Sequence, residues 1–78
     1  MEFSAKQIAE LIQGRVEGNA DAKVWDFAKI EEGREGCISF LSNPKYISYI
    51  YETKSSVVLV NEDAVFDKPI SATLIRMR

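Results

Sequence analysis

The sequence predicts a small α/β domain, a single sandwich in which two main helices pack on a mixed β-sheet. Helical and extended patterns alternate along its 78 residues, which is typical of this fold class. A helical pattern at 44–52 lies between strand patterns at 37–41 and 55–60, as in a right-handed crossover between parallel strands. The apolar share of 46% and the charged share of 28% indicate a globular domain rather than a disordered chain.

The first helix is predicted at Ala5–Gln13. Ser4 and Gln7 have the spacing of a capping box, in which each side chain accepts from the other residue's backbone amide. Three apolar residues then follow at helical spacing on one face: Ile8, Leu11 and Ile12. Gly14 is expected to end the helix in a left-handed conformation.

Two strands are predicted next, at 15–17 and 23–30, and the turn residues 18–21 separate them. The second strand is rich in β-forming residues, although its apolar residues alternate imperfectly. A polar loop with two glycines follows at 31–36, and residues 37–41 form a short apolar strand that is buried on at least one face.

The second helix is predicted to begin at Pro44 and to run to about Glu52. Proline disfavours helical angles at Asn43, which leaves Asn43 in the extended state of a capping residue, a position where Asn is favoured. The free amides and the positive dipole end of this helix would favour a nearby anion. Its side chains expected to face the core are Ile47, Ile50 and Tyr51.

The last two strands are predicted at 55–60 and 72–77, on either side of a charged loop at 61–69. The first of them is rich in β-branched residues and is expected to lie at the centre of the sheet. The second alternates apolar and polar residues well enough to complete the sheet.

Charge and residue usage exclude several classes of function. The net charge of −2 argues against nucleic acid as a partner, because binding to a phosphate backbone needs a basic face. No window reaches the ~20 apolar residues of a membrane span. The chain has no His and a single Cys37, so most nucleophile–base pairs and transition-metal sites cannot be assembled. We therefore expect a reduced, cytoplasmic setting, no cofactor or metal, and no catalysis by this chain alone.

The candidate binding residues are Phe40, Asn43 and Tyr46, which follow one another at equal spacings. Two flat rings with an amide between them could hold a planar, hydrogen-bonding ring such as a nucleobase. The same residues are also explained as a strand end, a helix cap and core packing, and Phe40 shares strand parity with Ile38, which favours a core position. The two roles of Asn43 are compatible, because a cap uses the carboxamide oxygen and leaves the amide nitrogen free to donate.

Several segments carry a resemblance to one family. They are Met1–Ala9, Ala28–Gly33 with Gly36, Ile38–Tyr46, Ser55–Val60 and Ala72–Arg76. These segments resemble the UDP-3-O-(3-hydroxyacyl)glucosamine N-acyltransferases of bacterial lipid A biosynthesis. The resemblance covers essentially the whole chain, but only the amino-terminal domain of that enzyme. Its most specific motif is S-F-L-x-N-P-K-Y, which begins at Ser39.

The resemblance implies that residues 1–78 form a uridine-nucleotide-binding domain. Phe40 and Tyr46 would sandwich the uracil ring, Asn43 would hydrogen-bond to it, and Lys45 is a possible phosphate neighbour. The family transfers a 3-hydroxyacyl chain from acyl carrier protein to the amine of UDP-3-O-acylglucosamine. Its catalytic histidine lies in a downstream left-handed β-helix, which also forms a homotrimer and which is absent from this sequence.

Two alternatives to this interpretation stay open. Mur-type peptidoglycan ligases also hold uridine nucleotides on a small α/β amino-terminal domain, which makes such a domain the second hypothesis. The third hypothesis is a protein-interaction module without a ligand, in which the motif is only a strand, a cap and a core. This last hypothesis predicts that Phe40 is fully buried.

Overall fold

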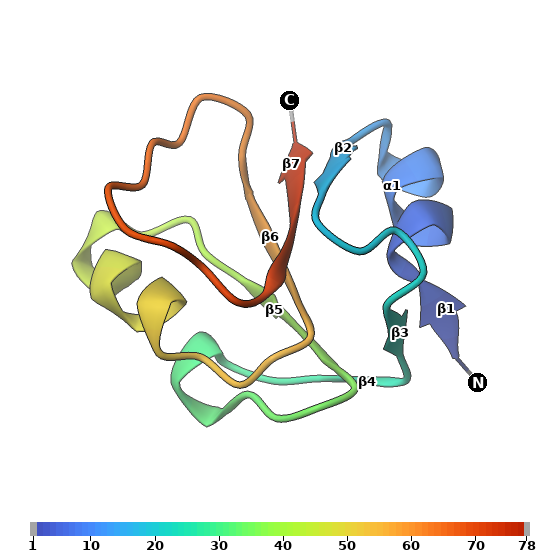
Figure 1. Cartoon of the computed structure of the whole chain (residues 1–78), viewed down its shortest axis with the longest axis horizontal. Coiled ribbons are helices and arrows are strands. Elements are labelled where there is room, and N and C mark those ends of the chain that lie inside the picture. The colour runs from blue at the N-terminus through green and yellow to red at the C-terminus, as the bar shows by residue number, and fades with distance from the viewer. Residues whose placement is uncertain (1, 78) are drawn as a thin grey trace.

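A computed structural model describes residues 2–77 and shows the predicted α/β sandwich (Figure 1). Its main sheet has five strands in the order β2-β7-β6-β5-β4. These strands are β2 (Arg15–Glu17), β4 (Asp26–Phe27), β5 (Cys37–Phe40), β6 (Val57–Asn61) and β7 (Thr73–Met77). Two further short strands, β1 (Phe3–Ser4) and β3 (Lys23–Val24), form a separate antiparallel pair. The helices are α1 (Ala5–Ile12) and two 3₁₀ helices, η1 (Ile30–Glu32) and η2 (Pro44–Tyr51).

The main sheet is mixed, as predicted. Strands β4, β5, β6 and β7 run parallel to one another, and β2 is antiparallel to β7 at the edge of the sheet. The predicted parallel pairing across η2 is confirmed, since Ile38 of β5 lies opposite Val57 of β6, and β6 is the central strand. The carboxyl ends of four parallel strands therefore meet at one edge of the sheet, which is where ligands usually bind in open α/β sheets.

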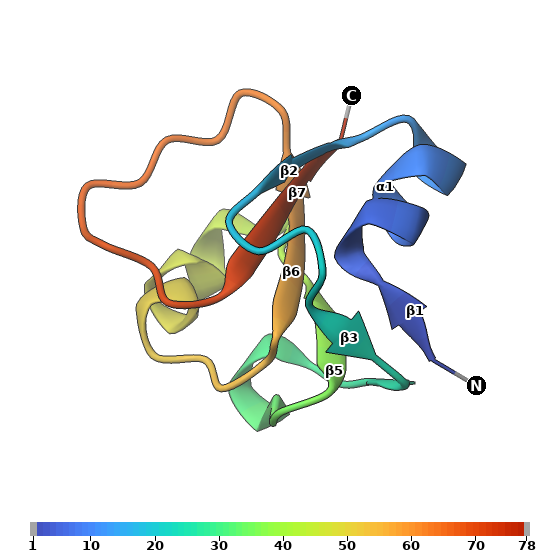
Figure 2. The ribbon, with the colours of Figure 1, turned by 45° about the vertical axis from the view of Figure 1, so that its right-hand side comes forward.

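The sheet is covered on both faces (Figures 1 and 2). On the first face, α1 and the β1–β3 pair enclose a cluster that includes Val57 and Ile75. On the second face, η1, η2 and the long loop after β6 enclose a cluster that includes Val58 and Leu74. Neighbouring residues of one strand thus belong to different clusters, as expected where side chains alternate across a sheet. We call these surfaces the α1 face and the η2 face.

The first helix begins as predicted and ends differently. The capping box is present, with Ser4 Oγ accepting from the amide of Gln7 at 3.1 Å and Gln7 Oε1 accepting from the amide of Ser4 at 2.8 Å. The left-handed residue is Gln13, with φ 58°, and not Gly14. Gly14 is required for space instead, because a Cβ there would lie 2.8 Å from Cγ2 of Ile75 on β7.

The single strand predicted at 23–30 is wrong, because the chain breaks there into β3, β4 and η1. At Trp25 the chain leaves the pair with β1 and joins β5, and the amides of Trp25 and Asp26 both donate to the carbonyl of Gly36, at 2.9 and 3.3 Å. Gly36 has φ 88°, and the Trp25 ring lies so close that a Cβ on Gly36 would be 2.2 Å from it. Ile30 then turns into the core of the η2 face.

The second helix has the predicted start and ends at Tyr51, one residue before the predicted Glu52. Ile50 is buried and Tyr51 half-buried, as expected, but Ile47 is exposed at 40% of its surface and lines a pocket. Among residues 2–77, no helix is long and apolar enough to cross a membrane.

Candidate functional site

Asn43 links the end of β5 to η2 and is the cap that the sequence predicts. Its backbone is extended, at φ −93° and ψ 119°. Its Oδ1 accepts from the amide of Lys45 at 3.0 Å, and its carbonyl oxygen accepts from the amide of Tyr46, also at 3.0 Å. Because Pro44 has no N–H, these two bonds use the amides of the first turn. The expectation of free amides that attract an anion here is therefore wrong.

Phe40 is the last residue of β5, and 54% of its surface is exposed. The core position favoured by its strand parity is therefore wrong, and so is full burial, which the protein-interaction hypothesis requires. Phe40 does lie on the α1 face, opposite Leu59. However, α1 packs mainly on β2 and β7, so the ring at the end of β5 extends beyond the part of the face that the helix covers.

The three predicted binding residues line one hollow at the carboxyl ends of β4 and β5. This hollow has a volume of about 300 Å³, and we call it the Phe40–Tyr46 hollow. Its lining consists of Lys29, Ile30, Glu31, Phe40, Leu41, Ser42, Asn43 and Tyr46. Tyr46 is half-buried, packs against the core of the η2 face, and lies 5.8 Å from the ring centre of Tyr49.

The polar groups around this hollow are only partly those that the sequence indicates. Lys45 is not in the lining, but its Nζ lies 5.8 Å from the ring centre of Tyr46. Lys29 and Glu31, which do line the hollow, were missed. The predicted strand at 23–30 and the predicted loop at 31–36 gave no reason to place these two side chains at the hollow. The turn of η1 brings them to its rim. The resembling segment 28–33 is the signal that could have identified them.

The turn of η1 is stabilised by residues that lie far from it in the sequence. The Thr53 hydroxyl donates to the carbonyl oxygen of Ile30 at 2.8 Å and accepts from the amide of Ser55 at 3.2 Å. Gly33 lies directly against Ser55, so that a Cβ on Gly33 would be 1.7 Å from Ser55 Oγ. The Oγ atoms of Ser55 and Ser39 are 2.5 Å apart and buried. The position of Lys29 and Glu31 therefore depends on β5 and on the segment leading into β6.

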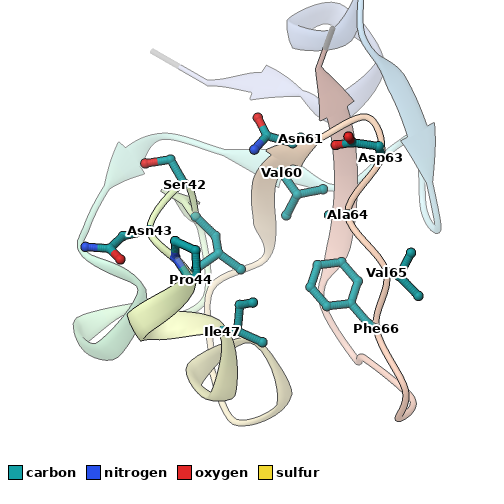
Figure 3. A pocket seen from close by; sticks show the side chains of 11 residues that line it. Ser42, Asn43, Pro44, Ile47, Val60, Asn61, Asp63, Ala64, Val65 and Phe66 are labelled. Carbon is teal, nitrogen blue, oxygen red and sulfur yellow. The ribbon is translucent and has the colours of Figure 1, made fainter.

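A second pocket, shown in Figure 3, shares Leu41, Ser42 and Asn43 with the Phe40–Tyr46 hollow. It has a volume of about 190 Å³ and lies between η2 and the loop after β6. In Figure 3 the ring of Phe66 and the side chains of Pro44 and Ile47 border this pocket, whereas the carboxamide of Asn43 points away from it. Asn43 is part of the lining of both hollows.

Arg76 fastens the loop that closes this second pocket. Its guanidinium donates to the carbonyl oxygens of Glu62, at 3.3 Å, and of Ala64. Its Nε also donates to Glu17 at 2.6 Å, and this hydrogen bond holds the pKa of the Glu17 carboxyl below its usual value. The loop is thereby tied to both β7 and β2.

The side chains of the site are of kinds that can bind a ligand. Rings, an amide and two opposite charges border the Phe40–Tyr46 hollow, and the sequence has no His to serve as a general base. Within residues 2–77, no group of three His, Cys, Asp or Glu side chains is placed to hold a metal ion. Such a hollow can stack a flat ring and read its hydrogen-bonding edge.

Comparison with known proteins identifies the family. Residues 21–78 match the family model described as "UDP-3-O-(3-hydroxymyristoyl) glucosamine N-acyltransferase, LpxD". The chain belongs to this family. The predicted resemblance to the acyltransferases is thereby confirmed, and the Mur-type ligase alternative is set aside.

Relatives of this family match nearly the whole chain. A protein of Bacteroides thetaiotaomicron is 65% identical over 77 residues, and one of Phocaeicola vulgatus is 62% identical over 77 residues. A protein of Christiangramia forsetii is 53% identical over all 78 residues. Each of the three is named UDP-3-O-acylglucosamine N-acyltransferase. These matches cover 99%, 99% and 100% of the chain but only 22%, 22% and 23% of the relatives, so the chain spans about a fifth of their length.

Proposed function

We propose that this chain is the uridine-recognition domain of an N-acyltransferase of lipid A biosynthesis. The observation that carries the proposal is that Phe40, Asn43 and Tyr46 line one hollow at the carboxyl edge of the sheet, in a member of the LpxD family. The uracil ring would stack between Phe40 and Tyr46, and stacking on an aromatic side chain contributes ~1–3 kcal/mol per base.

The cap gives Asn43 a defined role in choosing the base. Its Oδ1 is occupied by the amide of Lys45, and among residues 2–77 its amide nitrogen donates to no partner. The group that Asn43 presents to a ligand is therefore a donor, which pairs with a carbonyl oxygen. Uracil has carbonyl oxygens at positions 2 and 4, whereas cytosine has an amino group at position 4. Asn43 would thus favour uracil over cytosine wherever it meets position 4.

The charged residues around the hollow would serve the rest of the nucleotide. Lys45 lies beside the ring of Tyr46, and Lys29 is in the lining. Either lysine would attract the diphosphate of a bound nucleotide. Because both lysines are exposed, each contact would be screened by water and would add little affinity by itself.

The proposed parent enzyme transfers a 3-hydroxyacyl chain from acyl carrier protein to the amine of UDP-3-O-acylglucosamine. It works in the bacterial cytoplasm as a homotrimer, and its general-base histidine comes from another domain. The relatives' shared name, UDP-3-O-acylglucosamine N-acyltransferase, supports the reaction and the acyl acceptor in this proposal. In this scheme the chain holds the uridine end of the substrate while the chemistry takes place elsewhere.

Titration of the chain with UDP-N-acetylglucosamine, followed by NMR, tests the proposal. A slot on one small domain should bind weakly, with Kd on the order of millimolar, and should shift the amide signals of Phe40, Asn43 and Tyr46. Uridine monophosphate should bind more tightly than cytidine monophosphate. If saturating ligand leaves these signals unmoved, the isolated chain does not recognise uridine.

Replacement of Phe40 by Ala sharpens this test, with Phe27→Ala as the matched control. Both phenylalanines are exposed, at 54% and 82% of their surface, but only Phe40 lines the hollow. We expect F40A to abolish measurable binding and F27A to leave it unchanged. Equal losses in the two variants would show that the stacking site lies elsewhere.

A further inference from the structure

Helix η2, which carries Tyr46 to the Phe40–Tyr46 hollow, is unusual in kind and in length. It is a 3₁₀ helix over Pro44–Tyr51 and has eight residues. The hydrogen bonds of a 3₁₀ helix have poorer geometry than those of an α-helix, and runs longer than about three or four residues are uncommon. Such a helix depends on contacts with the rest of the domain to keep its place.

Packing restrains η2 only partly, because there is unfilled space beside it. The second pocket, of about 190 Å³, lies between η2 and the loop after β6, and its lining includes Pro44 and Ile47 of the helix and Phe66 of the loop (Figure 3). Closely packed neighbours hold an element in one position, and a cavity removes that restraint. On this side, the position of η2 therefore depends on specific bonds.

Tyr51, at the carboxyl end of η2, supplies these bonds. Its hydroxyl donates to Oδ1 of Asp67 at 2.9 Å and accepts from the amide of Asp67 at 3.2 Å. Its ring meets the ring of Phe66 edge-on, with 6.4 Å between the centres, and Nζ of Lys68 lies 5.6 Å from the Tyr51 centre. Three consecutive residues of the loop thus contact one side chain of the helix.

The loop is in turn anchored to the sheet by Arg76. The guanidinium that donates to the carbonyl oxygens of Glu62 and Ala64 also lies 5.8 Å from the ring centre of Phe66. Its bond to Glu17 joins it to β2. Phe66 is therefore in contact with both Arg76 and Tyr51, and the carboxyl end of η2 is connected through the loop to β7 and β2.

We propose that Tyr51 is a positioning residue for uridine recognition. Asn43 caps the amino end of η2, and the bonds between Tyr51 and Asp67 hold the carboxyl end, so that Tyr46 keeps its place at the hollow. Tyr51 does not line the hollow, and it acts on a nucleotide only through the position of η2. This inference rests on the proposed function, because it concerns the affinity of that site.

Replacement of Tyr51 by Phe keeps the ring and removes both hydrogen bonds. The apparent affinity of a site falls with the fraction of molecules in which the site is formed. Hydrogen bonds contribute modestly to stability, so we expect their loss to leave about a third of the folded molecules with η2 in the binding position. Uridine monophosphate should then bind about threefold more weakly to Y51F in an NMR titration.

Tyr49→Phe is the matched control. Tyr49 lies on the same helix, and its hydroxyl has no hydrogen-bond partner within residues 2–77, so Y49F should keep the native affinity. Urea unfolding of both variants shows how many molecules are folded during the titration. A purely structural role of Tyr51 would lower the free energy of unfolding without changing the affinity of the folded chain, and that result would overturn the proposal.

Variants of Asp67 test whether the bond itself matters. Asp67→Asn keeps the Oδ1 acceptor and should bind uridine monophosphate like the native chain, whereas Asp67→Ala loses one of the two bonds and should bind more weakly. In the Y51F background, D67A should add nothing, because the hydroxyl that Asp67 meets is already gone. A loss from D67A that persists in Y51F would contradict the proposal, since Asp67 would then act without Tyr51.

The position of η2 can also be measured without a ligand. The amide of Tyr46 bonds to the carbonyl oxygen of Asn43 at 3.0 Å, and its signal should move more in Y51F than in Y49F, although the rings of Tyr49 and Tyr46 are only 5.8 Å apart. An unmoved signal would overturn the proposal. Movement of this signal in a chain that binds no uridine would refute the proposed function and leave the tie on η2 standing. Clear uridine binding with equal affinity in Y51F would refute only the role of Tyr51.

Discussion

The two walls of the Phe40–Tyr46 hollow are held by bonds of different range. In the wall of residues 42–46, the amides of Lys45 and Tyr46 bond back to Asn43, only two and three residues away. In the wall of residues 29–31, a local bond joins the amide of Glu32 to the carbonyl oxygen of Lys29, and a long-range bond comes from Thr53, 23 residues from Ile30. The cap bonds of the first wall join residues of that wall only, whereas the second wall also depends on the segment between η2 and β6. Substitutions in the second wall should therefore weaken both the stability of the fold and binding at the site. A substitution in the first wall can weaken binding while leaving the stability nearly unchanged.

The largest expected effect is in the long-range wall, from replacement of Gly33 by Ala. The added Cβ would lie 1.7 Å from Oγ and 2.8 Å from Cβ of Ser55, so the chain must shift at a place where Ser55 is buried. Overpacking of this kind costs roughly 1–3 kcal/mol, sometimes more. Urea unfolding should show this loss, together with weaker binding of UDP-N-acetylglucosamine. Ser48→Ala, at an exposed site, is the control; if G33A matches it, the wall is not packed as described.

Replacement of Thr53 by Val should have the next largest effect. Valine keeps the shape but removes the hydroxyl that bonds Ile30 and Ser55, which leaves a partly buried carbonyl and amide without partners. Such a loss costs about 1–3 kcal/mol. Chemical shifts should change at Lys29 and Glu31 more than at Asn43. A uniform pattern of shifts across both walls would contradict the separation between them.

The difference in range also explains what could be predicted from the sequence. Three features that the sequence predicts depend on residues that lie close together in the chain. They are the capping box at Ser4, the Asn43–Pro44 start of η2 and the central strand β6. The resemblance names three residues that the structure brings to one hollow, and their role in binding stays a prediction. The break at Trp25 and the turn of η1 could not be predicted, because the carbonyl of Gly36 and the hydroxyl of Thr53 decide them.

The exposure of Phe40 escaped prediction for a related reason. Its strand parity correctly places it on the α1 face, but whether that face is covered at β5 depends on where α1 packs. Nothing within residues 37–41 carries that information. The same holds for Phe27 and Trp25, whose exposure depends on α1 lying over β2 and β7.

Substitutions of Asn43 separate cap from binding in the local wall. Asn43→Ala removes the cap and should cost about 0.5–2 kcal/mol of stability. Asn43→Asp keeps an oxygen that caps η2 but has no amide donor for the base, so stability should stay near that of the native chain while the affinity for uridine falls. Urea unfolding and NMR titration of both variants measure the two effects. Undiminished uridine binding by N43D would show that the amide does not contact the base.

The smallest expected effect is a pH response confined to Asp26 and Phe27 on β4, which lies outside both walls. The pKa of the Asp26 carboxyl lies below its ordinary value of 3.8, first because it accepts from the amide of Phe27 and second because it pairs with Arg34. A depressed folded-state pKa means that this contribution to stability is present above about pH 3.8 and is lost as the pH falls through the folded value. The Phe27 amide signal should therefore move on acidification.

The local wall provides the internal reference for this titration. The amide of Lys45 bonds to the neutral carboxamide of Asn43, which does not titrate, so its signal should stay constant while that of Phe27 moves. In Asp26→Asn the movement at Phe27 should disappear, because the remaining oxygen carries no charge to lose. Joint movement of Phe27 and Lys45 at the same pH would indicate global acid unfolding. The Asp26–Phe27 pair would then have no acid response of its own, and it would not differ from the Asn43 cap in this property.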